Sequence, residues 1–347
     1  MAKVRALTEE MHPAFEHLLR DAWMQNWDDK LGREIIRWRF YERPHGQPWV
    51  ACNDDSCVGM IDSMLRPHML DGHRVWIRQS ADWFCLPNHR TGIGLMLLNR
   101  VVTQGEPVLV IGGTGFTQQG LPKFGFRKLG SARYYVRPVT LRGLAGNLLR
   151  RRWWQQERLA QMMPHISWRM VERHRPMNGQ VSLMDENYEI PPPTGDGLVE
   201  IIEPWHWQWL LKMPRPMATP VGLAFSINDK FVGCSISQLE QTAVDPDGRI
   251  LHLQFVNPDV GRWIINSTVN FLRECNVGFV RCAATTEIKF KLFEEAGFIY
   301  TQPMPIHWYS RHVPPPIQVD AGYLHADDAM PLQALRGRRL GERYAHA

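Results

Sequence analysis

The chain of 347 residues lacks any long hydrophobic run. No stretch of about 18 consecutive apolar residues occurs, so we expect no membrane-spanning helix. Charged residues interrupt the N-terminal stretch MAKVRALTEEMHPAFEHLL every few positions, so it lacks the apolar segment of a signal peptide. Together these two absences predict a cytoplasmic protein.

Metal-binding and disulfide patterns are also missing from the sequence. None of the six cysteines belongs to a CxxC pair, and no group of histidines completes a zinc site. We therefore expect reduced, mostly buried thiols and no bound metal.

Positive charge exceeds negative charge only slightly in this sequence. The sequence has 40 Lys and Arg residues against 35 Asp and Glu residues, a formal net charge of +5. This excess suits an anionic ligand but is too weak to indicate nucleic acid as a partner.

What the sequence does contain is an internal repeat. The stretches WVACNDDSCVGMIDSM and LAFSINDKFVGCSISQL, from residues 49 and 223, each predict a strand, an Asn-Asp turn and a second strand that starts at Val-Gly. Both units later reach a Gly-Phe pair, Gly125-Phe126 in one and Gly297-Phe298 in the other. The shared landmarks predict two copies of one fold, at 1–139 and 197–312. A linker at 140–196 joins them, and an extended tail follows at 313–347.

Hydrophobic periodicity and turn residues divide the first copy into the order β-α-α-β-β-β-α-β-α-β. After the first strand, the predicted elements are helices 8–23 and 28–43, strands 48–53, 57–66 and 74–86, helix 92–104, strand 106–113, a short helix near 116–123 and strand 131–139.

The stretch LPNHRTGIGLML, residues 86–97, joins a long predicted strand to a helix. Backbone N–H groups at a helix N-terminus carry partial positive charge and converge on one point. A pyrophosphate can approach them where no Cβ stands in the way, which suits Gly92 and Gly94, and Arg90 can add charge-assisted hydrogen bonds. The alternative is a helix start that needs its glycines only for a turn.

This stretch and LPKFGF, residues 121–126, resemble the two signature motifs of the GNAT superfamily of acyl-CoA N-acyltransferases, although Pro87 and Gly92 are one residue closer than is usual in that family. The resemblance implies an α+β fold with two tandem GNAT-like domains, each a mixed, mostly antiparallel sheet flanked by helices. It also implies acetyl-CoA or another acyl-CoA as co-substrate. The residues expected to bind it are Phe84, Cys85, Leu86, Arg90, Thr91, Gly92, Ile93, Gly94 and Leu95, with Thr114 and Gly115 at the thioester end.

The resemblance also implies catalytic roles. The family often uses a carboxylate on the fourth strand as a base, and Asp82 is the only carboxylate on 74–86. The alternative for Asp82 is a strand-edge surface residue. Leu121 replaces the tyrosine that usually acts as the acid, so the acid is missing or comes from elsewhere. Tyr134 and its neighbour Tyr135 are candidates by their place in the chain.

The second copy lacks the glycine pair. Aligned from the prolines at 87 and 258, Gly92 corresponds to Trp263 and Gly94 to Ile265, and Asp259 adds a negative charge. We therefore predict that the C-terminal copy does not bind coenzyme A. It completes the acceptor pocket, packs on the first copy, or does both.

Two other stretches allow different interpretations. VLVIGGTGFTQQG, residues 108–120, looks like the start of a dinucleotide-binding fold, but Gln118 stands where a third glycine is required. The basic, Trp- and Leu-bearing helix pattern at 140–163 fits weak contact with an anionic membrane surface or a linker helix packed across both copies.

These patterns predict an N-acetyltransferase that passes an acyl group from coenzyme A to a primary amine by direct attack on the thioester. The acceptor is expected to be a small molecule, such as an amino sugar or amino acid derivative. One alternative is a non-catalytic acyl-CoA-binding sensor or scaffold, which the missing tyrosine allows. The other is an aminoacyl-tRNA-dependent peptidyl transferase, against which the intact glycine pair argues.

Overall fold

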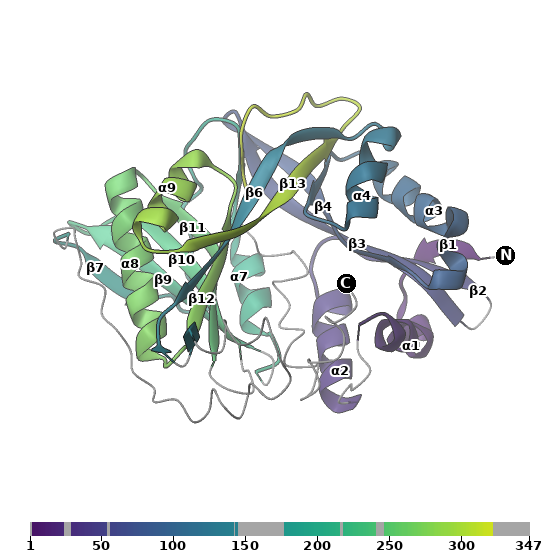
Figure 1. Ribbon diagram of the computed structural model, residues 1–347, viewed down its shortest axis with the longest axis horizontal. Helices are drawn as coiled ribbons and strands as arrows, with labels where there is room; N and C mark the ends of the chain where they lie inside the picture. Colours follow the sequence, from purple (N-terminus) through teal and green to yellow (C-terminus); the bar gives the residue numbers. More distant parts are fainter. Residues whose placement is uncertain are drawn as a thin grey trace.

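The computed structural model describes residues 2–23, 29–53, 56–141, 143–144, 177–215, 218–240 and 246–321. Over these residues the strands join in one mixed, mostly antiparallel sheet, and helices cover both of its faces (Figure 1). The predicted α+β fold class is therefore confirmed.

The N-terminal copy contains every element that its sequence predicts. In order they are β1 (Lys3–Ala6), α1 (His12–Trp23), α2 (Asp29–Ile36), β2 (Trp49–Asn53), β3 (Ser56–Leu70), β4 (His73–Cys85), α3 (Arg90–Val102), β5 (Val108–Ile111), α4 (Gly115–Gly120) and β6 (Arg127–Pro138). A π-helical turn, η2 (Arg37–Tyr41), extends α2, and a 3-10 turn, η3 (Pro87–His89), precedes α3. Strand β3 is longer than predicted because its hairpin with β4 continues to Asp71 and Gly72, which both have the positive φ of a tight hairpin turn.

From its hairpin onward the C-terminal copy repeats this order, but it begins with two strands and one helix, of which the first strand lies in the stretch 140–196 predicted as a linker. Its elements are β7 (Gln180–Leu183), β8 (Leu198–Glu200), α7 (Pro204–Leu211), β9 (Ala218–Ile227), β10 (Lys230–Glu240), β11 (Asp247–Phe255), α8 (Pro258–Glu274), β12 (Phe279–Ala284), α9 (Glu287–Glu295), β13 (Ile299–Tyr309) and β14 (Val319–Asp320). The two Gly-Phe landmarks occupy equivalent turns, because Gly125 and Gly297 both have left-handed backbone, with φ of +85° and +76°.

The two copies share one sheet because they exchange their last strands. The strand order is β1-β2-β3-β4-β5-β13-β6-β12-β11-β10-β9-β7. Strand β13, from the C-terminal copy, pairs with β5, whereas β6 pairs with β12, and both strands cross the centre of Figure 1. Separating the copies would therefore break four strand ladders, β5–β13, β13–β6, β6–β12 and β3–β8.

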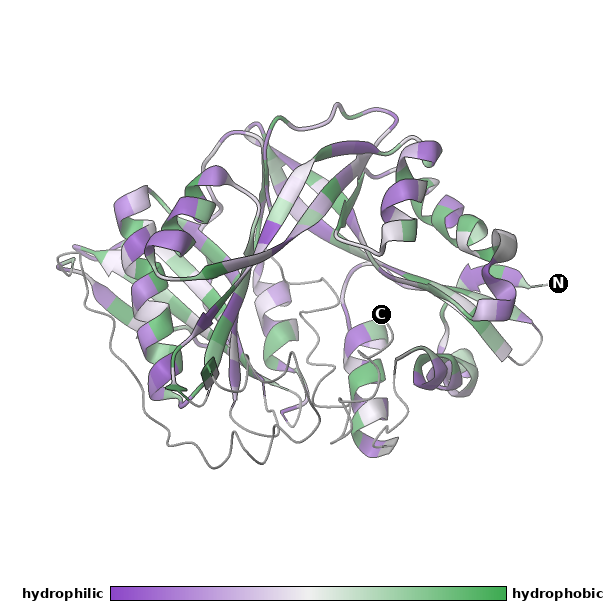
Figure 2. Cartoon of the chain, in the orientation of Figure 1, coloured by the Kyte–Doolittle hydropathy of each residue, from purple (hydrophilic) through white to green (hydrophobic). Residues whose placement is uncertain are grey.

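Helices pack on both faces of this sheet. We call the face that carries α1, α2 and α7 the inner face, and the face that carries α3, α4, α8 and α9 the outer face (Figure 1). Hydrophobic residues gather where the helices meet the strands, and hydrophilic residues on the outward turns of the helices (Figure 2). This amphipathic pattern is the one from which the helices were predicted.

Helix α7 meets the π-helical turn that extends α2 on the inner face. Trp38 of η2 and Trp209 of α7 stack with their ring centroids 4.6 Å apart. Each indole N–H donates a hydrogen bond to the other residue's backbone carbonyl, at 2.8 and 3.0 Å. This reciprocal pair lies in one apolar cluster to which both copies contribute side chains, so the copies are joined through their helices as well as their strands.

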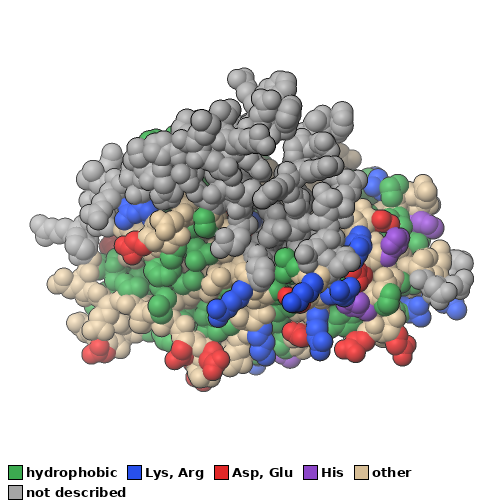
Figure 3. Space-filling model, turned by 90° about the horizontal axis from the view of Figure 1, so that it is seen from below, with side chains coloured by type: hydrophobic (Ala, Val, Ile, Leu, Met, Phe, Trp, Pro, Cys, Tyr) green, Lys and Arg blue, Asp and Glu red, His purple; other side chains and the backbone are tan. Residues whose placement is uncertain are grey.

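No helix within the described ranges is long and apolar enough to cross a membrane. Most of the basic pattern at 140–163 lies outside the described residues, and its two interpretations remain as stated. Seen from below, acidic and basic side chains are interspersed across the described part of the surface rather than separated into one basic patch (Figure 3).

Candidate active site

A gap opens in the sheet between β4 and β5. The two parallel strands pair only at Arg78 with Val108 and at Gln79 with Leu109. Strand β4 continues for six residues beyond Gln79 without a partner on this side. The predicted binding residues Phe84, Cys85 and Leu86 follow one edge of the gap, and Thr114 and Gly115 follow the end of the other strand.

A bulge in β4 turns its end away from β5. The pairing with β3 shifts between Met60 and Asp62, and Asp82 has a left-handed backbone with φ of +49°. A non-glycine residue holds such a conformation only where its surroundings fix it. The bulge and the gap are therefore one feature, and Asp82 lies at its origin.

A buried ionic network fixes this bulge. The Asp82 carboxylate accepts a hydrogen bond from Arg39 of η2, and both side chains are almost completely buried. Next to it, Arg43 donates two hydrogen bonds to Asp62, at 2.9 and 2.8 Å. Burial alone would raise the pKa of Asp62, but Arg43 and then Arg39 outweigh it and lower that pKa.

The N-terminus of α3 faces this gap and is uncapped. Its cap residue, His89, makes no side-chain hydrogen bond to the helix, and no acidic residue lies in the first turn. Gly92 has a φ of +86°, and a Cβ built on it would meet nothing within 4 Å. The backbone N–H groups here are thus bordered by open space, as an anion site requires.

The second glycine has a different environment. A Cβ on Gly94 would approach the indole of Trp83 at 3.4 Å, which is an ordinary van der Waals contact. Gly94 therefore lets Trp83, which follows the bulge, pack close to the helix. The sequence does not reveal this contact, because nothing in the motif points to the residue after Asp82.

The other predicted binding residues surround the same helix start. Cys85 and Ile93 share an apolar cluster, and burial raises the pKa of the Cys85 thiol to about 11 although the charge of Arg90 opposes the shift. Arg90 and Leu95 are exposed. The side chain of Thr91 lies outside the described residues.

The loop after β5 belongs to the same site. The Thr114 side chain caps α4 by accepting a hydrogen bond from the Thr117 N–H at 3.4 Å. The N–H of Gly112 donates to the Pro305 carbonyl of β13 at 2.9 Å. The C-terminal copy thereby holds the far edge of the gap. Strand β5 has β4 and β13 as neighbours and only the six-residue α4 after it, which is not a dinucleotide-binding unit.

Tyr134 and Asp82 both belong to the inner face. Tyr134 packs on a cluster that includes Ile111, the last residue of β5. Tyr135 points to the outer face and donates a hydrogen bond to Glu294 at 2.9 Å. Leu121, at the position of the usual tyrosine, is fully buried. The catalytic roles of Asp82 and Tyr134 remain predictions.

The corresponding helix of the C-terminal copy, α8, is capped by its own residues. The Asn257 side chain accepts a hydrogen bond from the Val260 N–H at 3.0 Å. Asp259 pairs with Arg262 at 2.6 Å in the first turn. A Cβ on Gly261 would come within 2.8 Å of Leu292. This helix start therefore offers no open anion site.

The alignment of the two helices differs from the one based on the prolines. The 3-10 turn η3 lies between Pro87 and α3, whereas α8 begins at Pro258 itself. Counted from the caps, Val260 corresponds to Gly92 and Arg262 to Gly94. Trp263 instead packs edge-on against Phe225, with the two ring centroids 5.0 Å apart.

Comparisons with known proteins bear on this fold and site. Residues 12–108 match the family model of the acetyltransferase (GNAT) family. No curated protein sequence is significantly similar to the chain.

Solved structures resemble the whole chain at low identity. A GCN5-related N-acetyltransferase from Anabaena variabilis has a TM-score of 0.53 at 13% identity and covers 89% of this chain and 72% of its own. N-myristoyltransferase from Saccharomyces cerevisiae with bound myristoyl-CoA has a TM-score of 0.54 at 9% identity, and the match covers 90% of this chain and 84% of that one. Eis1 from Mycobacterium abscessus has a TM-score of 0.50 at 16% identity, and the match covers 89% of this chain and 72% of that one. At these identities the likeness concerns the fold.

Proposed function

We propose that the N-terminal copy, which matches the acetyltransferase (GNAT) family model over residues 12–108, transfers an acetyl group from acetyl-CoA to a primary amine. The acceptor is a small molecule such as an amino sugar or amino acid derivative. The superfamily is one of acyl-CoA N-acyltransferases, and the acetyl group and the acceptor are the parts that this proposal adds.

The start of α3 carries the proposal. Gly92 combines left-handed backbone with open space where a side chain would stand, and the helix leaves its first N–H groups uncapped. A pyrophosphate fits such a cradle, because backbone donors and the helix dipole both favour a negative group there. Arg90, exposed one turn earlier, adds a positive charge beside it.

The residues around the gap have separate tasks in this reaction. Acyl-CoA supplies a thioester, whose carbonyl carbon the amine attacks while the C–S bond breaks and the thiol leaves. The bulge fixed by Asp82 and Arg39 keeps the gap open beside β5. The amine approaches from the inner face, where Asp82 and Tyr134 lie, and gives up one proton to Asp82, while Tyr134 gives one proton to the leaving thiolate.

Calorimetry with acetyl-CoA tests the binding site. Gly92→Trp puts a large side chain into the cradle and strains the backbone, so affinity falls by at least about 100-fold if several charge-assisted hydrogen bonds to the pyrophosphate are lost. Gly105→Trp is the matched control, because Gly105 also has positive φ and open space but lies beyond the other end of α3. Absence of wild-type binding, or equal loss in both variants, would refute the proposed cradle.

The role of Asp82 needs a second comparison, because its pairing with Arg39 gives it a structural task as well. If Asp82 accepts the proton, Asp82→Asn lowers kcat by about 100-fold or more, and adding Arg39→Met does not restore it. If Asp82 only holds the bulge, removing both charges relieves the unpaired Arg39 and restores much of kcat. Full activity of Asp82→Asn at every pH would exclude it as the base.

One observation favours a second function, a non-catalytic sensor of acyl-CoA. Leu121 is buried where the acid of a catalytic member would stand, and Asp82 is engaged by Arg39. Thiol release with a panel of amines separates the two functions. Acetyl-CoA binding without thiol release for any amine would favour the sensor.

A further inference from the structure

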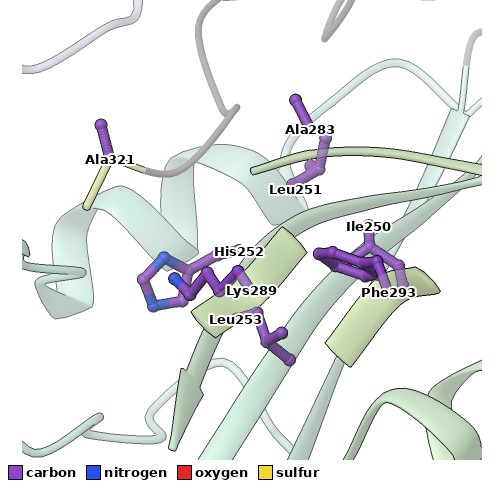
Figure 4. A pocket seen from close by; sticks show the side chains of 8 residues that line it. All are labelled: Ile250, Leu251, His252, Leu253, Ala283, Lys289, Phe293 and Ala321. Atoms are coloured by element: carbon purple, nitrogen blue, oxygen red, sulfur yellow. The ribbon is translucent and has the colours of Figure 1, made fainter. Parts of the chain in front are cut away.

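The C-terminal copy also has a gap between its two parallel strands. Strands β11 and β12 pair from Asp247 with Phe279 to Ile250 with Cys282 and then separate, as β4 and β5 do. In this second gap lies a small cavity of about 10 Å³. It is lined by Ile250, Leu251, His252, Leu253, Ala283, Lys289, Phe293 and Ala321 (Figure 4).

A carboxylate of the chain itself pairs with the lysine in the wall of this cavity. Asp320 of β14 accepts a hydrogen bond from the Lys289 ammonium group at 2.5 Å. The next residue, Ala321, donates its N–H to the Thr285 hydroxyl at 3.3 Å. Lys289 lies in the first turn of α9, whose start is capped by the Thr286 side chain. The arrangement is a built site for one carboxylate, and Asp320 occupies it.

His252 shows that Asp320 does not satisfy the whole site. The residue is 6% exposed, and neither ring nitrogen makes a hydrogen bond of normal geometry within the described part of the chain, although the side chain of Gln254 acts on the ring as a hydrogen-bonding group. Figure 4 shows the ring lying across the Lys289 side chain. A buried histidine without well-formed hydrogen bonds is costly, so its donor and acceptor indicate a ligand with more polar atoms than one aspartate offers.

The segment that carries Asp320 pairs with the sheet at few positions. Strand β14 has two residues and pairs with β8 at Val319 and Asp320 only. The Asp320 side chain is still 24% exposed, against 10% for Lys289. An incoming carboxylate would take over the ion pair of Asp320 with Lys289, while the neighbouring Val319 and Ala321 stay packed in their apolar cluster.

This site lies on the side from which the proposed acceptor approaches. Ala283, in the cavity wall, is the direct neighbour of Tyr134 across the β12–β6 ladder. Ala321 and Ile111, the end of β5, belong to the same apolar cluster. Between β5 and β12 lie β13 and β6, so three strand spacings of about 4.8 Å, roughly 14 Å in all, separate the two gaps.

We propose that the C-terminal copy holds a carboxylate subsite, formed by Lys289, His252 and Thr285, and that the acceptor amine carries a carboxylate roughly 14 Å or more away which replaces Asp320 there. The proposal rests on the proposed function for its acceptor, but not for the subsite itself. Asp320 is then an internal competitor of the acceptor, and the degenerate copy selects acidic substrates.

Tetraglycine and its C-terminal amide are suitable probes, because four extended residues span roughly 14 Å and the two differ only in the carboxylate. With acetyl-CoA present, Lys289→Met should raise KM for tetraglycine by about tenfold and leave KM for the amide unchanged. Asp320→Asn, which keeps the shape of the segment, should lower KM for tetraglycine alone. Lys291→Met is the matched control, since Lys291 lies on the same helix but is 78% exposed.

A binding measurement separates this inference from the proposed function. N-acetyltetraglycine has no amine to acylate, and we expect it to shift the imidazole NMR signals of His252 in Asp320→Asn but not in Asp320→Asn/Lys289→Met. A shift without any acetyl transfer would refute the transferase and keep the subsite. Equal KM for the acid and the amide, or no shift in Asp320→Asn, would overturn the subsite.

Discussion

Strands β4 and β5 separate around α3 in the same way as β11 and β12 separate around α8, yet the two gaps contain different things. In the first, an uncapped helix with a left-handed glycine faces open space. In the second, Asn257 caps the helix and Asp259 fills its first turn. At the gap itself, Asp320 pairs with Lys289.

The difference between them is local. Both backbones have a helix N-terminus aimed at a splayed strand pair, and the sheet runs through both without interruption. A cap residue, one positive φ and one salt bridge decide which end can receive an anion. The two helix starts can therefore differ in what they offer to an anion while the strands and helices around them stay alike.

Breaking the first gap should have the largest effect on stability. Asp82→Asn leaves Arg39 buried without its main partner, with Asp62 still 4.0 Å away, so the free energy of unfolding should fall by about 3 kcal/mol. Urea denaturation measures this loss. Glu203→Gln removes the half-exposed pair with Arg74 and should cost under about 1 kcal/mol. Equal losses would mean that the bulge does not depend on its ion pair.

A second comparison uses one buried histidine from each copy. Burial lowers the pKa of His68 and of His252 to about 3, from 6.5, and nearby charges add to the shift, from Arg66 for both and from Lys289 for His252. Between pH 6.5 and 3 the unfolded chain therefore binds protons that the folded chain does not. Stability should fall as the pH falls through this window, by at most about 1.4 kcal/mol per pH unit for each histidine.

Single variants assign this slope to each copy. His252→Gln and His68→Gln should each make the decline from pH 6.5 to 3 shallower, as followed by urea denaturation at several pH values. A substitution at Lys289 should change the pKa of His252 more than that of His68, since the charge of Lys289 lowers the pKa of His252 only. An unchanged slope in either variant would show that the histidine concerned is protonated in the folded chain.

Much of the first copy follows from its sequence, because hairpin turns, capping residues and hydrophobic periodicity are local. The Gly-Phe turn and the position of α3 are examples. The exchange of β6 and β13 does not follow, since the alternation of a strand is the same whichever neighbour it pairs with. The ion pair of Arg39 with Asp82 is equally hidden, because 43 positions separate the two residues.

The candidate site shows the same limit. The motif points to Gly92 and Gly94 together, but only the structure separates open space at one from the Trp83 indole at the other. Asp320, which pairs with Lys289 at the second gap, comes from the stretch 313–347, where composition predicts an extended tail. Contacts between distant segments decide both features, and no local pattern encodes them.

Changing the two caps should shift the free energy of unfolding by about 1 kcal/mol, upward for α3 and downward for α8. His89→Asn gives α3 the cap that α8 has, so stability should rise by about 1 kcal/mol while acetyl-CoA binds several-fold more weakly. Asn257→Ala should lower stability by a similar amount and leave acetyl-CoA affinity unchanged. Urea denaturation and calorimetry on the same samples measure both. Weaker acetyl-CoA binding in Asn257→Ala would place a second cofactor site in the C-terminal copy.

The smallest effect distinguishes the two glycines of α3. Gly94→Ala adds a methyl group at ordinary contact distance from Trp83, so acetyl-CoA affinity should change less than about threefold, an effect within about 0.7 kcal/mol. Gly92→Ala meets no atom but must keep a φ of +86°, which costs a residue with a Cβ about 1–2 kcal/mol. Calorimetry of both variants ranks them. If Gly94→Ala were the more damaging, the pyrophosphate would approach past Gly94, and the cradle would have to be moved toward Trp83.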